Sequence, residues 1–254
     1  MTHAALSARA LRVSIGHRSI VDVPALDLQA GCWTAVVGPN GAGKTSLLKA
    51  LAQLLPADGQ VALQERPIGT WPAKQRARVL AWMGQGEHGA DDLLAFDVAM
   101  LGRLPHQGWL GAPTAADSAA VEAAMRRTQS WDWRARPLGS LSGGERQRVL
   151  LARAFAVEAE ILLMDEPLAN LDAPHQADWL LAVRELVAAG RTVVSVLHEL
   201  GMALQADRLL VMRDGQVVHH GASADASTHD ALRDVFDRRI ELHQVAGQWV
   251  VLPH

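Results

Sequence analysis

A glycine-rich loop between a short strand-like run and a predicted helix is the feature that most constrains the fold. Residues 34–37 suit a buried strand, and residues 46–54 are predicted to be helical. The loop and the first helical residue read Gly38, Pro39, Asn40, Gly41, Ala42, Gly43, Lys44, Thr45 and Ser46. This order matches G-x-x-x-x-G-K-[ST] in a strand–loop–helix setting, in which backbone N–H groups and the helix N-terminus face an anion. We therefore predict that the loop cradles the phosphates of a nucleotide.

Two side chains of this loop have predicted chemical roles. Lys44 would reach the β- and γ-phosphates and assist catalysis, and the Thr45 hydroxyl would ligate Mg²⁺. The alternative is an ordinary glycine-rich turn in front of a helix. The flanking strand and helix favour the nucleotide site over that alternative.

Composition limits the classes of protein to which the chain can belong. Its 254 residues fit one large α/β domain, or a domain with a subdomain, and 49% apolar residues supply a sizeable core. A net charge of −3 predicts no nucleic-acid partner. The single cysteine, Cys32, excludes an internal disulfide and is interpreted as a small core residue.

Neither a targeting segment nor a membrane span is expected. Residues 1–10 lack a long apolar stretch, and no apolar run reaches the length that crosses a bilayer. We expect a cytoplasmic chain that would act at a membrane only through a partner.

Strands alternate with helices over much of the chain, which predicts a largely parallel sheet. Residues 6–15 and 21–28 are expected to form two strands around a turn at 16–17, and residues 208–212 and 216–218 a hairpin at 214–215. Residues 91–138 are rich in alanine at helical spacing, with a loop over 105–113. The predicted fold class is α/β: a P-loop NTPase core, an antiparallel part at the N-terminus and an inserted α-helical subdomain.

Two carboxylates follow an apolar run at residues 161–164. The run suits a strand buried on both faces, and Asp165 and Glu166 then emerge at its carboxyl end, where α/β sheets place ligands. Asp165 would bind Mg²⁺ through water, and Glu166 would polarise the water that attacks the γ-phosphate. The alternative is an acidic strand end that faces solvent.

A second anion site is predicted at the start of another helix. The string Leu141-Ser142-Gly143-Gly144-Glu145-Arg146-Gln147-Arg148 precedes a largely apolar helical run at 149–154. A serine hydroxyl and exposed N–H groups at a helix N-terminus suit an anion. Because one γ-phosphate does not need two such sites, we infer that this one faces the nucleotide of a second copy. The alternative is an ordinary serine N-cap.

With this string the chain resembles the ATP-binding cassette (ABC) ATPases over nearly its full length. The resemblance implies that Ser142, Gly143, Gly144 and Glu145 belong to the site of an ATP held by the partner protomer. It also implies roles for four residues outside that string: Gln85 near Mg²⁺, Asn170 and Asp172 in a loop at the dimer interface, and His198 as a switch that bonds the γ-phosphate.

One position departs from the family pattern. The family usually stacks an aromatic residue, commonly tyrosine, on adenine, and this chain contains no tyrosine. The matching position is Ile15, which would offer adenine an aliphatic face. We therefore expect weak base selectivity, with triphosphate contacts dominating the affinity.

The resemblance implies a single ABC ATPase domain over 1–254, with a nucleotide-binding core at 1–90 and 157–254 and a helical subdomain at 91–156. Within the subdomain, residues 101–106 read Leu-Gly-Arg-Leu-Pro-His. This stretch resembles ATPases of importers for iron–siderophores, haem and cobalamin, and overall similarity slightly favours cobalamin. The alternative is that these are general features of all cassettes.

The first functional hypothesis is the ATP-hydrolysing subunit of such an importer. It implies ATP and Mg²⁺ as cofactors, and as partners a second copy, polytopic permease subunits and, indirectly, a substrate-binding protein. The subunit would sit peripherally on the cytoplasmic face of the membrane. The alternatives are a soluble ABC ATPase that is not tied to transport and a nucleotide-sensing module.

Overall fold

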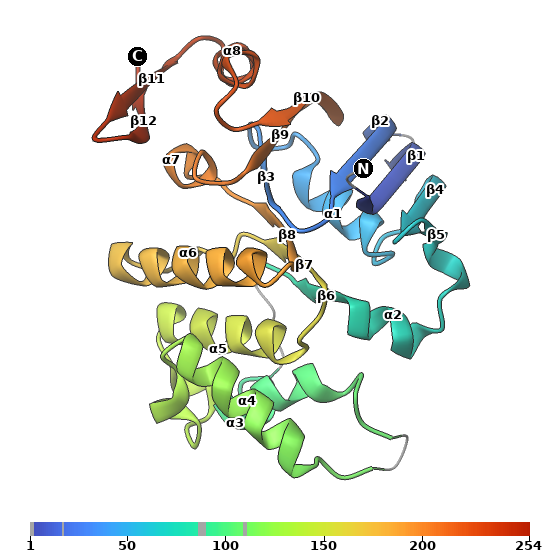
Figure 1. Ribbon diagram of the computed structural model, residues 1–254, viewed down its shortest axis with the longest axis vertical. Coiled ribbons are helices and arrows are strands. Elements are labelled where there is room, and N and C mark those ends of the chain that lie inside the picture. Colours follow the sequence, from blue (N-terminus) through green and yellow to red (C-terminus); the bar gives the residue numbers. More distant parts are fainter. Residues whose placement is uncertain (1–2, 17, 86–89, 109–110) are drawn as a thin grey trace. The chain divides into compact units, whose positions relative to one another are not determined.

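The computed structural model describes residues 3–16, 18–85, 90–108 and 111–254 (Figure 1). The chain forms two compact units, Met1–Thr70 with Thr192–His254, and Trp71–Arg191. The sequence predicts a nucleotide-binding core at 1–90 and 157–254 and a helical subdomain at 91–156. This functional division remains a prediction. His17 and residues 109–110, which belong to a predicted turn and a predicted loop, lie outside the described residues.

The first unit contains the predicted antiparallel part. Strand β1 (Ala4–Ile15) pairs with β2 (Arg18–Gln29) on one side and with β4 (Asp58–Leu63) on the other. A turn at 64–65, where both residues have positive φ, lets β5 (Arg66–Pro67) pair back onto β4.

The parallel strands of this unit surround β3. Strand β3 (Trp33–Val37) lies between β8 (Thr192–Val196) and β9 (Arg208–Arg213) and is parallel to both. Every residue of β3 and β8 is buried, as expected for strands covered on both faces. Strand β10 (Gln216–Ala222) returns antiparallel to β9 through a turn with positive φ at both of its central residues, which confirms the predicted hairpin.

Three helices and a hairpin complete the first unit: α1 (Lys44–Leu51), α7 (Leu200–Ala203), α8 (Ala226–Val235), and strands β11 (Ile240–Val245) and β12 (Gln248–Pro253). Helix α8 begins at Ala226, in a first turn that is polar. Cys32 is only half-buried, because it lies at the rim just before β3, so its interpretation as a core residue was wrong.

The second unit begins with a helix that the sequence analysis did not predict. Helix α2 (Ala73–Val79) has no buried residue, so no apolar periodicity marked it. Strand β6 (Leu80–Met83) follows α2 and pairs in parallel with β7 (Ile161–Asp165).

The described part of the second unit also contains the helices α3 (Ala95–Met100), α4 (Ala115–Arg127), α5 (Gly143–Ala156) and α6 (Ala173–Ala188). The first two pack against α5, which confirms a helical insertion (Figure 1). Short 3-10 turns occur in both units, at Ile68–Thr70, Leu101–Arg103, Trp131–Trp133 and Leu138–Ser140. Among the described residues, no helix combines the length and the apolar character that crossing a bilayer requires.

A buried cation joins three segments of this helical part. Arg103 donates to Asp117 on α4 at 3.0 Å, to the backbone oxygen of Ala156 at 2.6 Å and to Glu158 at 2.6 Å. Gly102 precedes it, and a Cβ there would lie 2.2 Å from the backbone oxygen of Arg153. Because a buried charge is tolerated when it is paired and hydrogen-bonded, Arg103 can lock α4 to the end of α5.

Candidate nucleotide site

The phosphate loop has a backbone that only glycine can adopt at its two ends. Gly38 and Gly43 have φ of +151° and +90°. A Cβ at Gly38 would lie 2.1 Å from the backbone oxygen of Met212, and one at Gly43 would lie 2.7 Å from that of Ile20. These contacts hold the loop between β9 and β2, in a kind of backbone whose N–H groups can form an anion cradle.

Lys44 lies folded against this loop at the start of α1. Its side chain is buried, and Nζ donates to the backbone oxygens of Gly38 at 2.8 Å and Pro39 at 3.0 Å. Thr45 follows it, half-buried, in the first turn. That turn contains no acidic residue, so the positive end of the helix dipole is left to an anion.

His198 lies at the same sheet edge as the phosphate loop. Strands β3 and β8 are parallel neighbours, and the N–H of Leu197 donates to the oxygen of Val36 at 3.1 Å. Both strands therefore end together, with Gly38 after one and an exposed His198 after the other. Ile15 is 61% exposed at the end of β1, and its predicted contact with adenine remains a prediction.

In the second unit, the parallel pair β6–β7 brings two predicted site residues together. Gln85 follows β6 and Glu166 follows β7, and the Gln85 amide Nε2 donates to Glu166 Oε2 at 2.5 Å. Asp165, the last residue of β7, is buried. Glu166 has a φ of +53°, a conformation that side chains other than glycine rarely adopt.

The start of α5 shows one of the two alternatives that the sequence left open for Ser142, the N-cap. The Ser142 hydroxyl accepts from the Glu145 N–H at 3.3 Å, and Glu145 Oε2 accepts from the Ser142 N–H at 2.8 Å, which is a capping box. The hydrogen bond from the Ser142 backbone N–H is the main reason why the pKa of Glu145 lies below its ordinary value. Glu145 therefore has a structural role at its own helix, and its assignment to the partner's ATP remains a prediction.

The signature, which is the string at 141–148, packs through its two glycines against the loop that follows Glu166. A Cβ at Gly144 would lie 2.8 Å from the backbone oxygen of Asn170, and one at Gly143 would lie 3.3 Å from the Asn170 side chain. Asn170 itself has a φ of +61°. The second unit thus brings three predicted segments together: the signature, the interface loop and the strand-end carboxylates.

Asp172 begins α6 as its N-cap. Its Oδ1 accepts from the backbone N–H of His175 at 3.3 Å and also contacts His175 Nδ1. The hydrogen bond with the His175 side chain is the main reason why the pKa of Asp172 lies below its ordinary value. Asp172 is exposed and ionised, so its carboxylate remains accessible at the end of the loop.

Sequence reasoning gave no role to Gln147, although it stands in the quoted signature string. Its buried amide Nε2 donates to the backbone oxygens of Glu166 at 3.2 Å and Pro167 at 2.9 Å. The signal that could have revealed it is a polar residue placed among the apolar positions of α5.

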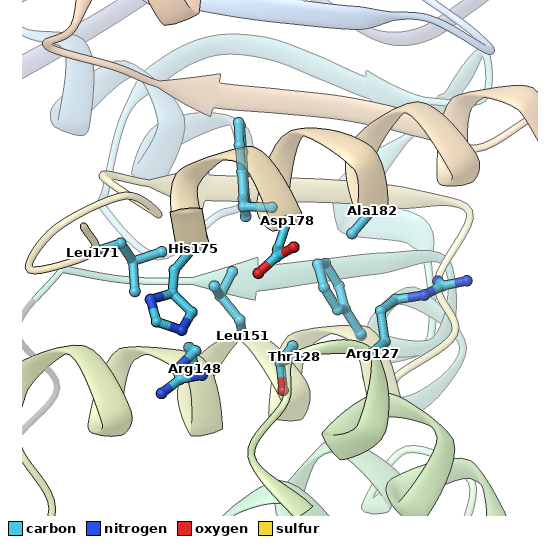
Figure 2. Close-up of a pocket in the computed structure, with 10 residues that line it drawn as sticks. Arg127, Thr128, Arg148, Leu151, Leu171, His175, Asp178 and Ala182 are labelled. Carbon is cyan, nitrogen blue, oxygen red and sulfur yellow. The ribbon is translucent and has the colours of Figure 1, made fainter. Parts of the chain in front are cut away.

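A small hollow lies between α4, α5 and α6, beside this region (Figure 2). Arg148 enters it from α5, over the ring of Trp133 at 4.3 Å, and lies near His175 of α6. The hollow has a volume of about 20 Å³, which holds about one water and is too small for a nucleotide. Burial lowers the pKa of Arg148, which Glu145, Asp172 and Asp178 oppose by their charge.

Comparison with known proteins decides the family. A family model described as ABC transporter matches residues 21–169. The chain belongs to the ABC transporter family. It is an ATPase domain of that family, and this confirms the resemblance seen in the sequence.

Three curated relatives are similar over almost the whole chain. A hemin import ATP-binding protein of Streptomyces coelicolor is 40% identical, covering 98% of this chain and 89% of the relative. A probable siderophore transport system ATP-binding protein of Bacillus subtilis is 35% identical, covering 100% and 94%. A cobalamin import ATP-binding protein of Halobacterium salinarum is 39% identical, covering 92% of this chain and 59% of the relative.

A solved structure supports the fold. It is described as a metal-chelate type ABC transporter in an inward-facing conformation, and it aligns with a TM-score of 0.80 over 100% of this chain and 98% of its own. Because the sequence identity is only 24%, this match supports the fold and nothing further. The predicted α/β cassette with a mostly parallel sheet and an antiparallel N-terminal part is confirmed.

Proposed function

We propose that this ABC ATPase is the ATP-hydrolysing subunit of an importer for a metal chelate: haem, an iron–siderophore or cobalamin. The observation that carries the proposal is the nearly full-length similarity to import ATP-binding proteins named for these three cargoes. Identities of 40% and 39% to the hemin and cobalamin relatives do not separate the cargoes. The slight preference for cobalamin is therefore not carried further.

ATP binding is assigned to the phosphate loop. Residues 38–46 would hold the phosphates through their backbone N–H groups, which all of them except Pro39 have. The Lys44 ammonium would leave its loop carbonyls to meet the β- and γ-phosphates. This exchange is chemically reasonable, because a phosphate compensates a buried ammonium better than neutral carbonyls do.

A magnesium ion fits the donors that are present. Among the described residues no group of three or more His, Cys, Asp or Glu side chains could hold a metal alone. Mg²⁺ prefers oxygen ligands and usually keeps waters and substrate phosphates, so the Thr45 hydroxyl, the buried Asp165 carboxylate and the Gln85 amide oxygen suit it. When bound, it would neutralise charge on the transferring phosphoryl group.

Hydrolysis is assigned to Glu166 and His198. The Glu166 carboxylate would accept a proton from the attacking water, and His198 would donate to the γ-phosphate and hold that water. Gln85 donates to Glu166, so this amide can set the direction of the carboxylate. The exposed His198 lies at the shared edge of β3 and β8, where it would meet a ligand.

The second copy would complete each site. Ser142 and Gly143 are exposed at the N-terminus of α5, with N–H groups and a positive dipole end that suit the γ-phosphate of a partner. Asn170 and Asp172 lie on the neighbouring loop and would meet the partner there. No nucleic acid is expected among the partners.

The transport assignment is tested by its partners and its cargo. We expect the chain to co-purify with a polytopic permease at the cytoplasmic face of the membrane, and uptake to require a substrate-binding protein as well. Uptake of cobalamin, haem and ferric chelates, measured side by side in cells with and without an active subunit, should identify one dependent cargo. Normal uptake of all three without the subunit would favour a soluble ABC ATPase not tied to transport.

A further inference from the structure

Gln147 is a buried polar side chain to which the function proposed above gives no role. It is 8% exposed on α5, and its amide Nε2 donates to two successive backbone oxygens, those of Glu166 and Pro167. Both acceptors lie in the turn directly after β7. A buried amide with two acceptors in one turn restrains the position of that turn.

The restrained turn is the one that carries the Glu166 carboxylate. Glu166 has a φ of +53°, and a side chain other than glycine keeps such a conformation only where its surroundings hold it. The N–H of Ala169 also donates to the Glu166 oxygen, at 3.2 Å. The Gln147 amide thus supplies part of what holds the backbone of Glu166 in place.

The other end of the same loop contacts the same helix. Gly144 and Gly143, at the start of α5, pack against Asn170 with no room for a side chain at Gly144. Helix α5 therefore contacts the loop 166–170 at both ends, through Gln147 and through the two glycines. A displacement of the start of α5 must move this loop, and Glu166 with it.

We propose that Gln147 is a positioning residue that couples the start of α5 to the backbone of Glu166. Contact of Ser142 with the partner's ATP is then passed through α5 to the carboxylate that acts on the chain's own ATP. This inference rests on the proposed function, in which Glu166 is the general base and Ser142 faces the partner's nucleotide. In the competing interpretation Gln147 only stabilises the fold.

The first test removes the two N–H donors and keeps the length of the side chain. In the full chain, with Mg²⁺ and ATP, Gln147→Met should lower kcat roughly tenfold or more, because a carboxylate displaced by about an ångström is a poor base. KM and Kd for ATP should stay within about twofold, since the phosphate loop is not touched. Gln147→Asn keeps the N–H donors on a shorter side chain and should lose less activity.

Gln176→Met is the matched control. Gln176 donates one amide bond to a backbone oxygen, that of Leu171 at 3.1 Å, just beyond the loop 166–170. Its loss should lower the melting temperature about as much as Gln147→Met does, and should leave kcat unchanged. Equal kcat values for the two methionine variants would overturn the inference.

The second test asks whether Gln147 acts through Glu166. Under single-turnover conditions, the double variant Gln147→Met with Glu166→Gln should be no slower than Glu166→Gln alone, because the carboxylate to be positioned is already gone. Multiplied losses would assign Gln147 a purely structural role.

The two levels of the proposal fail differently. Normal hydrolysis by Glu166→Gln rejects the general base, and with it the coupling. An inactive Glu166→Gln together with an unchanged kcat in Gln147→Met rejects the coupling alone. Should Gln147→Met not fold, Gln147→Asn takes its place, and an unchanged kcat in that variant rejects the coupling.

Discussion

At the residue scale, the surrounding contacts hold the backbone of the proposed general base and of the loop that follows it in place. Glu166 and Asn170 both have positive φ and lie at the two ends of one short loop. A conformation of this kind is unfavourable by itself, and it recurs where the direction of a side chain matters. The carboxylate of Glu166 is directed further by the amide of Gln85.

Replacing Glu166 with glutamine should separate ATP binding from ATP hydrolysis. Without a proton acceptor beside the γ-phosphate, we expect kcat to fall by a hundredfold or more, about the contribution of a general base. ATP affinity should be kept, and ATP should trap a dimer visible by size-exclusion chromatography. Glu160→Gln, at an exposed position before β7, is the control and should hydrolyse normally.

Gly144→Ala tests the close contact between α5 and the interface loop. The new Cβ would lie 2.8 Å from the Asn170 oxygen, so the loop must move. We expect a loss of turnover of roughly tenfold or more, with ATP affinity unchanged. Gly69→Ala is the control, because its Cβ would meet only the end of the Gln53 side chain, at 3.7 Å. Wild-type turnover in Gly144→Ala would show that this contact is not needed.

At the scale of the elements, two helices of the second unit begin with the same device. Helix α4 has a capping box between Thr114 and Asp117, and α5 has one between Ser142 and Glu145. The caps satisfy N–H groups that a helix leaves unpaired at its start. Only the cap of α5 is also proposed to face a nucleotide. The cap of α4 can therefore serve as a control for the effect of losing a cap on stability.

Alanine at each cap should distinguish an ordinary N-cap from an anion site. Ser142→Ala and Thr114→Ala should each lower the free energy of unfolding by about 1 kcal/mol. Only Ser142→Ala should also slow ATP hydrolysis, because it removes the hydroxyl offered to the partner's nucleotide. Denaturant unfolding and steady-state ATPase assays measure the two effects. Equal turnover in both variants would leave Ser142 as a cap alone.

The junction between α4 and Arg103 should make stability sensitive to acid. Hydrogen bonds from the backbone N–H and the hydroxyl of Thr114, and then from Arg103, lower the pKa of Asp117 from 3.8 to about 2. A carboxyl whose pKa is lower in the folded protein stabilises the fold at any pH above its ordinary pKa. That contribution is lost as the pH falls through the pKa of the folded protein.

We therefore expect Asp117→Asn to be less stable than the wild type at neutral pH. The difference in the free energy of unfolding should shrink as the pH falls from about 4 to about 2, as the wild type itself takes up the proton. Denaturant unfolding at a series of pH values measures it, with Asp132→Asn at an exposed position as the control. A difference that stays constant over this range would contradict the assignment.

At the scale of the whole molecule, the proposal requires two copies for each complete site. Lys44→Ala removes the cation of a chain's own site, and Ser142→Arg blocks the site of its partner. Each variant alone should be inactive. A 1:1 mixture should recover hydrolysis, because a mixed dimer has one site with an intact Lys44 facing an intact Ser142.

The recovered rate should approach about one quarter of the wild-type rate, since half of the dimers are mixed and half of their sites are complete. ATPase activity of the separate and mixed proteins measures it, with a mixture of two Lys44→Ala preparations as the control. The absence of any recovery, or full turnover by a strictly monomeric chain, would contradict the shared site.

Much of the fold and of the candidate site could be predicted from local patterns. The phosphate loop, the apolar run before Asp165 and the Asp214-Gly215 turn are each contiguous in the chain, so their spacing alone carries the signal. Helix α2 was missed because its exposed residues have no apolar periodicity. The role of Cys32 was misjudged because exposure at the rim of a sheet depends on what packs beside it.

The amino-acid sequence by itself determined the chemical groups of this ATPase and their order, because each motif lies within one strand–loop–helix segment. Only the tertiary structure decided which of them meet. Gln85 bonds Glu166 across 81 positions, and Gln147 bonds the backbone of Glu166 across 19. Such bonds depend on the register of paired strands and on how helices pack, and these follow from the folded chain as a whole rather than from neighbouring residues.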